Sequence, residues 1–154
     1  MRLHVIAVGK RLPAWAEQAC SEYAKRVRGD CSLHVRPVAS SRRGGTDPGA
    51  RVREEGQALL RAVPRSALLV ALEIDGDGWS TEQLAQRFAA WRGSERDVAF
   101  LIGGADGLSA QCRKAARHCW SLSSLTLPHA LARVVVVEQL YRAWSLAHGH
   151  PYHH

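Results

Sequence analysis

The sequence predicts an α/β fold with a three-layer, parallel-type sheet, and two observations carry that prediction. Short apolar runs of β-type composition alternate five times with segments of helical periodicity along the 154 residues. Strands that alternate with helices pair in parallel and are covered by helices on both faces. A chain of this length also buries roughly two thirds of its unfolded surface. We therefore expect one domain, residues 1–154.

Each element follows from its own stretch of sequence. Strands are expected at Leu3–Val8, Ser32–Val38, Ala67–Ile74, Asp97–Ile102 and, with the weakest β composition, Leu122–Leu127. Helices are expected at Ala14–Val27, Ala50–Ala62, the segment from Ser80-Thr81-Glu82 through Trp91, Ser109–Cys119 and Leu131–Ala147. The second helix is expected to carry Glu54 and Glu55 on its solvent-facing side.

The charge balance suggests a polyanionic partner. There are 21 Lys and Arg against 14 Asp and Glu, a net charge of +7, although a positive charge also serves solubility alone. Four of the arginines, Arg42, Arg43, Arg51 and Arg53, lie in or beside the aperiodic stretch ASSRRGGTDPGARVR. We expect a mobile loop there, which is either a contact to a phosphate backbone or a solvated connector.

The sequence gives little support for a membrane protein, a secreted protein or a metal-binding protein. The N-terminus has only a short apolar run, and no stretch approaches the ~18 apolar residues of a membrane span. We expect a soluble, cytoplasmic chain whose four cysteines, lacking any C-x-x-C spacing, are reduced and act as small buried hydrophobes. No metal site is expected. The one rival interpretation is the histidine-rich end HGHPYHH, as a metal ligand set or a tag remnant.

The most particular local feature is a glycine turn, VAFLIGGADGLSAQC, between an expected strand and an expected helix. Such a turn lies at the carboxyl end of a parallel sheet, where α/β folds bind ligands. The turn lacks the lysine of a P-loop, and its G-G-x-x-G order after the fourth strand is not the Rossmann pattern. Glycine here either permits close approach of a ligand or only makes a tight turn.

A second segment, WSLSSLTLPH, interleaves serines and a threonine with leucines. Hydroxyl and backbone groups beside an apolar slot suit a flat heterocycle such as adenine. This uncharged lining also suits a ligand without phosphate.

Several blocks, in order, resemble one known family: AVGK at Ala7, LIGG with GLS at Leu101–Ser109, WSLS and LTLPH at Trp120–His129, LYRAWS at Leu140, and HPYH ending at His153. They are similar to the SPOUT-superfamily methyltransferases that methylate N3 of a pseudouridine in 23S ribosomal RNA. The resemblance covers the whole chain. It implies a C-terminal trefoil knot, a rare feature that the periodicity of the sequence would not predict. It also implies the cofactor S-adenosylmethionine and a homodimer that acts on 23S rRNA in the large subunit or the assembled ribosome.

The resemblance also implies site residues. Cofactor-binding residues would be Leu72, Gly103, Gly104, Leu122, Ser123, Ser124, Leu125, Thr126 and Leu127, and substrate-side catalytic residues would be Glu138, Arg142, Tyr152 and His153. From the residues alone, Glu138 and Arg142 are equally an i, i+4 ion pair, and Tyr152 is equally part of an unstructured end. The apolar residues of the last helix exceed one buried face, which also indicates subunit packing.

One position departs from the family pattern. Family members usually carry Arg or Lys directly after HPYH, whereas this chain has His154, whose charge depends on pH. Two other functions stay open at this point: a SPOUT enzyme that acts on another RNA, such as transfer RNA, and a non-enzymatic RNA-binding module of the ribosome.

Overall fold

The fold is a parallel sheet of five strands with helices on both faces. The computed structural model describes residues 1–43, 47–94 and 96–153. The strands are β1 (Arg2–Val8), β2 (Ser32–Val38), β3 (Leu68–Gly78), β4 (Val98–Ile102) and β5 (His118–Ser121). Their order in the sheet is β2-β1-β4-β3-β5, and every neighbouring pair is parallel. The α/β, three-layer prediction is confirmed.

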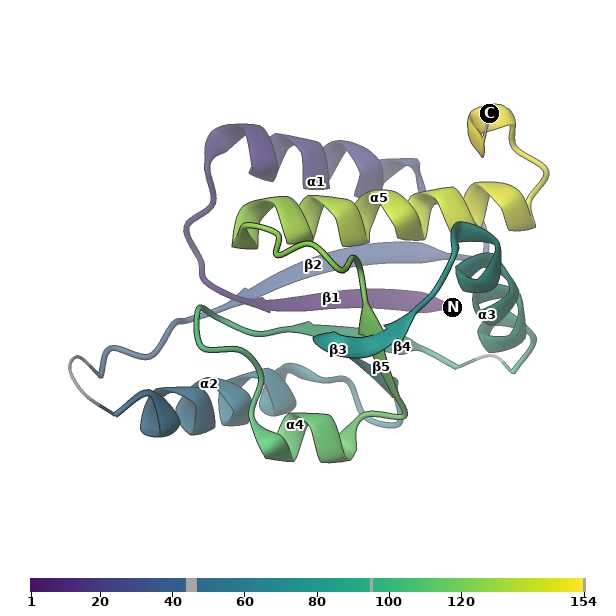
Figure 1. Cartoon of the computed structure of the whole chain (residues 1–154). Helices are drawn as coiled ribbons and strands as arrows, with labels where there is room; N and C mark the ends of the chain where they lie inside the picture. The colour runs from purple at the N-terminus through teal and green to yellow at the C-terminus, as the bar shows by residue number, and fades with distance from the viewer. Residues whose placement is uncertain (44–46, 95, 154) are drawn as a thin grey trace.

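The helices form the two outer layers, as Figure 1 shows. They are α1 (Ala14–Arg26), α2 (Pro48–Ala62), α3 (Thr81–Gly93), α4 (Ala110–Ala115) and α5 (His129–Ala147), followed by the short 3-10 helix η1 (Pro151–His153). α5 packs against α1 and α3 on one face, while α2 and α4 cover the other. η1 folds back onto α5, which brings the C-terminal tail beside that helix.

Each face of the sheet has its own apolar core because side chains alternate along a strand. On β1, Leu3, Val5 and Ala7 face α1 and α5, whereas Ile6 and Val8 face α2 and α4. All five are essentially inaccessible to solvent. The central strand β4 is buried along its whole length, as its continuous apolar run predicts.

The last strand differs from the prediction, and Leu122–Leu127 is wrong as its location. α4 ends at Ala115 rather than Cys119, because Ala116 adopts an extended backbone. The chain then pairs with β3 over His118–Ser121. Trp120 anchors this pairing by stacking on Trp79, with ring centroids 5.3 Å apart. Residues 122–127 form a loop beyond the strand.

The basic loop is also more ordered than expected over the residues that the structure describes. Glu55, predicted to face solvent, is only 8% exposed. Its carboxylate accepts the Ser41 N–H at 3.0 Å. Arg43 pairs with Glu54 at 2.9 Å, and Arg51 of α2 pairs with Asp106 in the glycine turn at 3.1 Å. Two of the four arginines, for which a phosphate contact and a solvated connector were equal alternatives, are thus paired with carboxylates of this chain.

Other expectations have mixed outcomes. Cys20, Cys31 and Cys112 are free and buried, as predicted, and Cys119 is free and half-buried. No helix in the described part of the chain is long and apolar enough to cross a membrane. The trefoil knot stays a prediction, because strand order does not specify which segment passes through which loop.

Candidate active site

The glycine turn after β4 packs tightly on itself. Gly107 donates its N–H to the Gly104 carbonyl at 3.0 Å and has a positive φ of 84°. A Cβ atom on Gly103 would lie 2.5 Å from the carbonyl carbon of Gly107, and one on Gly104 would lie 2.7 Å from a carboxylate oxygen of Glu55. The packing of the turn therefore explains both glycines without a ligand. This agrees with the alternative in which glycine here only makes a tight turn.

A shallow pocket of about 120 Å³ lies where the loop after β5 faces the end of β3. Six of the nine predicted cofactor residues line it: Leu72, Leu122, Ser123, Leu125, Thr126 and Leu127. Gly103, Gly104 and Ser124 are not among its lining residues, and Ser124 is exposed. Residues that sequence reasoning missed are Glu73, Ile74, Trp120, Ser121 and Ala132. For Glu73 and Ile74 the available signal was their place directly after Leu72 in the same strand.

Hydroxyl groups shape this loop from within. The Ser121 hydroxyl donates to the Ser123 carbonyl at 3.2 Å, and the Ser123 hydroxyl accepts the Leu125 N–H at 2.9 Å. These bonds replace the ladder that would have continued β5, which explains why the alternating pattern does not form a strand here. They also turn Leu125 outward, leaving it 72% exposed.

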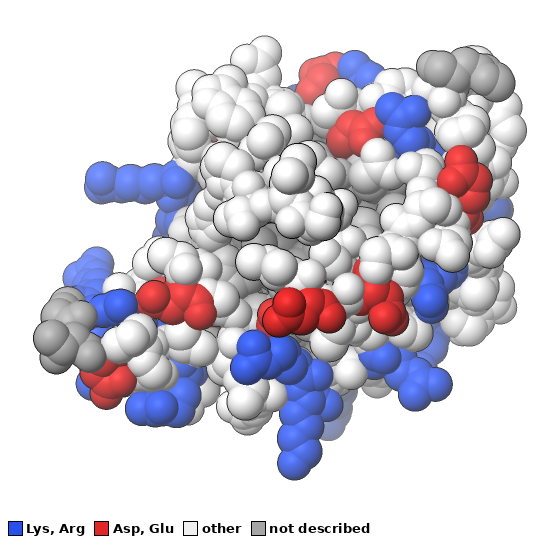
Figure 2. All heavy atoms as spheres, viewed as in Figure 1, with Lys and Arg blue, Asp and Glu red and all other residues white. Residues whose placement is uncertain are grey.

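The pocket residues fit a flat apolar group that carries positive charge. Ile74 is 67% exposed beside Leu125, and large exposed apolar side chains at a pocket indicate a binding surface. Figure 2 shows a broad uncharged area on this face, bordered by acidic side chains. Glu73 supplies a carboxylate in the lining, and its burial raises its pKa despite the nearby Arg113. The indole N–H of Trp120 is buried with no partner among the described residues.

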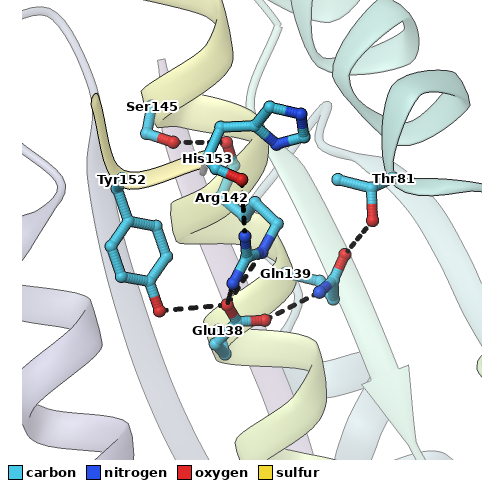
Figure 3. A network of polar contacts seen from close by, with 7 residues as sticks. All are labelled: Thr81, Glu138, Gln139, Arg142, Ser145, Tyr152 and His153. Carbon is cyan, nitrogen blue, oxygen red and sulfur yellow. Dashed lines mark hydrogen bonds and ion pairs between the residues drawn. The ribbon is translucent and has the colours of Figure 1, made fainter. Parts of the chain in front are cut away.

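A network of polar contacts joins α5 to the C-terminal tail (Figure 3). The Glu138 carboxylate accepts Arg142 Nη2 at 2.6 Å, Arg142 Nε at 3.0 Å and the Tyr152 hydroxyl at 3.1 Å. Arg142 also donates to the His153 carbonyl at 3.3 Å and lies 4.8 Å from the centre of the Tyr152 ring. The structure thus brings together all four predicted substrate-side residues, and the ion pair proposed as an alternative is present as well.

The network indicates orienting roles rather than proton transfer by Glu138. Its two oxygens accept four hydrogen bonds, the fourth from Gln139 Nε2 at 2.7 Å. The hydrogen bond with Glu138 raises the pKa of Arg142, which stays positively charged. Burial, together with contacts to Tyr23 and Glu138, raises the pKa of Tyr152 well above its usual range, so its hydroxyl stays protonated.

Two further residues extend this network and were not predicted. Gln139 donates to Glu138 and accepts a hydrogen bond from the Thr81 hydroxyl at 2.9 Å, which ties the network to the start of α3.

The tail is ordered: Tyr152 lies 4.5 Å from Tyr141, centroid to centroid, and packs against the core. Tyr152 is therefore not part of an unstructured end. His154 lies outside the described residues.

The pocket and the network use different parts of α5. Ala132 lines the pocket, whereas Glu138 begins the network six residues later. Six residues advance a helix by about 9 Å and rotate it to a face roughly 120° away. In one chain the network and the pocket therefore lie on different faces of α5.

Comparisons with known proteins agree with this architecture. A family model described as a predicted SPOUT methyltransferase matches residues 1–153. Proteins named Ribosomal RNA large subunit methyltransferase H are 49% identical in Thioalkalivibrio sulfidiphilus (strain HL-EbGR7) and 48% identical in Hahella chejuensis (strain KCTC 2396), each over 154 residues and 99% of both chains. The crystal structure of TrmJ from Z. mobilis ZM4 superposes with a TM-score of 0.53 at 20% identity, covering 91% of this chain and 69% of that one, which supports the fold alone. The chain belongs to the SPOUT methyltransferase family.

Proposed function

We propose that this protein methylates N3 of a pseudouridine in 23S ribosomal RNA, using S-adenosylmethionine. The observation that carries the proposal is the full-length match to relatives named Ribosomal RNA large subunit methyltransferase H. The pocket of residues 122–127 supports the proposal as the candidate cofactor side, and the Glu138–Arg142–Tyr152 network supports it as the candidate substrate side. The net charge of +7 suits an RNA substrate.

In the proposed site, Leu72 and the 122–127 loop hold the adenine portion of the cofactor. Gly103 and Gly104 shape the adjoining turn. S-adenosylmethionine, when bound, supplies a methyl group on a positively charged sulfur. The Glu73 carboxylate in the lining favours that positive charge. The cofactor leaving group needs no protonation, so alignment of the two reactants is the main requirement.

The substrate side is proposed to lie at the network. The uracil ring must lose its N3 proton to solvent before N3 bonds to the methyl carbon. Arg142 stabilises the resulting negative charge on the ring, because a preorganised cation acts where charge develops. Glu138 keeps Arg142 in place through two hydrogen bonds. Tyr152 and His153 position the nucleotide from the tail.

We further propose that the active protein is a homodimer in which each site uses the pocket of one subunit and the tail of the other. The pocket and the network lie on different faces of α5, which supports this arrangement. The cavity of about 120 Å³ is also smaller than the ~300 Å³ of typical ligand sites, as expected if a second subunit completes it. Exposed Ile74, Leu125 and Leu131 offer apolar surface for a second copy. Within its own chain, α5 buries only about half of its other apolar residues: Val136, Val137, Leu140, Tyr141, Ala143 and Trp144.

The remaining parts of the proposal follow from the same family. Residues 1–154 form a single SPOUT domain with a C-terminal trefoil knot, and the protein works in the cytoplasm on the large subunit or the assembled ribosome. A SPOUT enzyme for another RNA is the alternative. A non-enzymatic RNA-binding module would have no use for the pocket.

The direct test is mass spectrometry of 23S rRNA from cells with and without the gene. We expect one methyl group to be missing from one pseudouridine in the deletion strain and to return with a plasmid copy. Transfer RNA from the same cells serves as the internal comparison. Unchanged 23S rRNA together with a lost methyl group in transfer RNA would replace this proposal by the alternative enzyme.

A further inference from the structure

A second and larger pocket is lined by Tyr152 but not by Arg142. It measures about 660 Å³ and lies between the end of α1, the end of α5 and the tail. Its lining residues are Arg26, Arg28, Tyr141, Trp144, His150, Pro151 and Tyr152. Only Tyr152 among them belongs to the site described above, so most of this pocket has no assigned role.

Aromatic rings form the floor and one wall of the pocket. Tyr141 and Trp144 are stacked, with centroids 5.7 Å apart and planes 22° apart, and both are almost completely buried. The Trp144 indole donates to the Arg28 carbonyl at 3.2 Å, which fixes the ring. His150 and Pro151 are exposed and Tyr152 is half-buried. The pocket therefore has a rigid floor and an accessible ring-bearing wall.

The charges around these rings are positive. Arg26 lies 5.7 Å from the centre of the Tyr141 ring, and Arg28 is exposed beside it. None of the described residues that line the pocket is Asp or Glu. Two acidic groups contact lining residues: Glu138 accepts the Tyr152 hydroxyl at 3.1 Å, and the Glu22 carboxylate lies 3.4 Å from Arg26 on the exposed surface of α1. Such exposed i, i+4 pairs are weak and do not prevent binding of another anion.

This combination of groups selects a nucleotide by its chemistry. A base can stack against the accessible rings, and arginines bind the phosphates on either side of it. Stacking of this kind needs a base that is not stacked in a duplex, which favours a single-stranded segment. A volume of about 660 Å³ falls within the ~300–1,000 Å³ of small-molecule sites.

We propose that this pocket, named here the Arg28 pocket, binds a nucleotide of single-stranded RNA next to the one that is methylated. The inference rests on the proposed function, because Tyr152 forms a wall of the pocket and also contacts Arg142 and Glu138. A strand whose target base lies at Arg142 needs to continue only past Tyr152 to reach the pocket. The pocket then reads the strand by shape and charge rather than by the target base.

The test compares two double variants that remove equal charge. Arg26→Ala with Arg28→Ala empties the pocket of cations, whereas Arg61→Ala with Arg65→Ala removes two arginines at the end of α2 and in the following loop, on the other face of the sheet. The probe is a short single-stranded RNA with one 4-thiouridine, measured by fluorescence anisotropy over a range of salt. Thermal unfolding establishes that each variant is folded.

We expect the pocket variant to bind this RNA about tenfold more weakly than the control, with a salt slope shallower by about 0.7 for each phosphate contact removed. Arg28→Lys should keep most of the affinity, because it keeps the charge. Crosslinks from 4-thiouridine should map to Tyr141, Trp144, His150 or Pro151, which line the pocket and are not part of the proposed target-base site. Equal affinities and salt slopes for the two double variants would contradict RNA binding in the Arg28 pocket. Crosslinks confined to other residues would contradict it as well.

These outcomes separate the pocket from the proposed function. Binding of S-adenosylmethionine and methylation of 23S rRNA by wild-type protein test the function and do not use the short RNA. If wild-type protein methylates 23S rRNA but the two double variants bind alike, only the Arg28 pocket fails. If a second subunit covers the pocket, the RNA will not crosslink to it. That result would also contradict the proposed RNA site.

Discussion

Gly103 touches Gly107 across the turn that follows β4. A Cβ atom on Gly103 would lie 2.5 Å from the Gly107 carbonyl carbon and 2.6 Å from its oxygen. Both atoms are backbone, and the turn is closed by the hydrogen bond from Gly107 to Gly104 at 3.0 Å. A side chain at position 103 would therefore force the backbone of Gly107 to move.

We therefore predict that Gly103→Ala destabilises the whole protein and does not act only on the cofactor. Overpacking of this kind costs about 1–3 kcal/mol, and each kcal/mol shifts the Tm of a domain of this size by about 2–4 °C. Gly78→Ala is the matched control, because a Cβ there meets no atom within 4 Å. Calorimetric unfolding should show a lower Tm for Gly103→Ala only; equal Tm values would contradict the packing argument.

Glu73 is predicted to discriminate between S-adenosylmethionine and its demethylated product, because only the former carries a sulfonium. Glu73→Gln should weaken binding of S-adenosylmethionine by about two- to fivefold, the effect of one partly exposed charge pair. Binding of S-adenosylhomocysteine should change little. Isothermal titration calorimetry with both ligands measures the ratio, and an equal loss for both would show that Glu73 does not face the sulfur.

The same residue predicts a pH dependence. Burial raises the pKa of Glu73 above its ordinary 4.5, so its carboxylate begins to take up a proton at a higher pH than an exposed glutamate. The preference for S-adenosylmethionine over S-adenosylhomocysteine should therefore decline as the pH is lowered from neutral toward that pKa. Glu73→Gln should have a small preference that stays flat over the same range. A wild-type preference that does not change with pH would exclude this role.

A mixed dimer should test whether the site is shared between subunits. Arg142→Ala removes the guanidinium from the tail side, and Leu127→Trp blocks the cofactor pocket. Each variant alone should be inactive. Mixed subunits should regain about a quarter of wild-type activity, because half of the dimers are mixed and each has one intact site. Methyl transfer to 23S rRNA is the readout, and no recovery in a mixture shown to contain mixed dimers would place both halves in one chain.

Asp30 is predicted to make stability depend on pH in the acid range. A hydrogen bond from His148 at 3.0 Å and one from Arg92 at 2.6 Å lower the pKa of Asp30 to about 2. Because the folded pKa is lowered from 3.8, the stabilisation is complete above pH 3.8 and is lost as the pH falls toward 2. Solvent screening limits it to below about 1 kcal/mol, since the Asp30 side chain is 49% exposed.

The comparison is Asp30→Asn, whose Tm should lie below that of the wild type above pH 4. The difference should shrink as the pH approaches 2, because Asp30 then takes up a proton and progressively loses its charge. Arg92→Ala should reproduce part of the effect. A difference that is constant from pH 2 to pH 6 would show that the carboxylate charge is not involved.

The sequence by itself determined the fold class, the five helices, four of the five strands and the family. These features depend on local patterns: apolar periodicity, capping residues such as Ser80, and motif blocks that stay contiguous in the chain. The i, i+4 spacing of Glu138 and Arg142 also predicted a contact that the structure contains. Each of these signals lies within a short stretch of sequence.

Only the tertiary structure decided the features that depend on partners far away in the chain. The last strand is His118–Ser121 because β3 offers a pairing edge there and Trp79 stacks on Trp120. Glu55 is buried because Ser41 and the glycine turn close over it. Gly103 is required by Gly107, and Tyr152 is ordered by Tyr141 and Glu138. Contacts of this kind follow from packing of the whole chain, which no local pattern specifies.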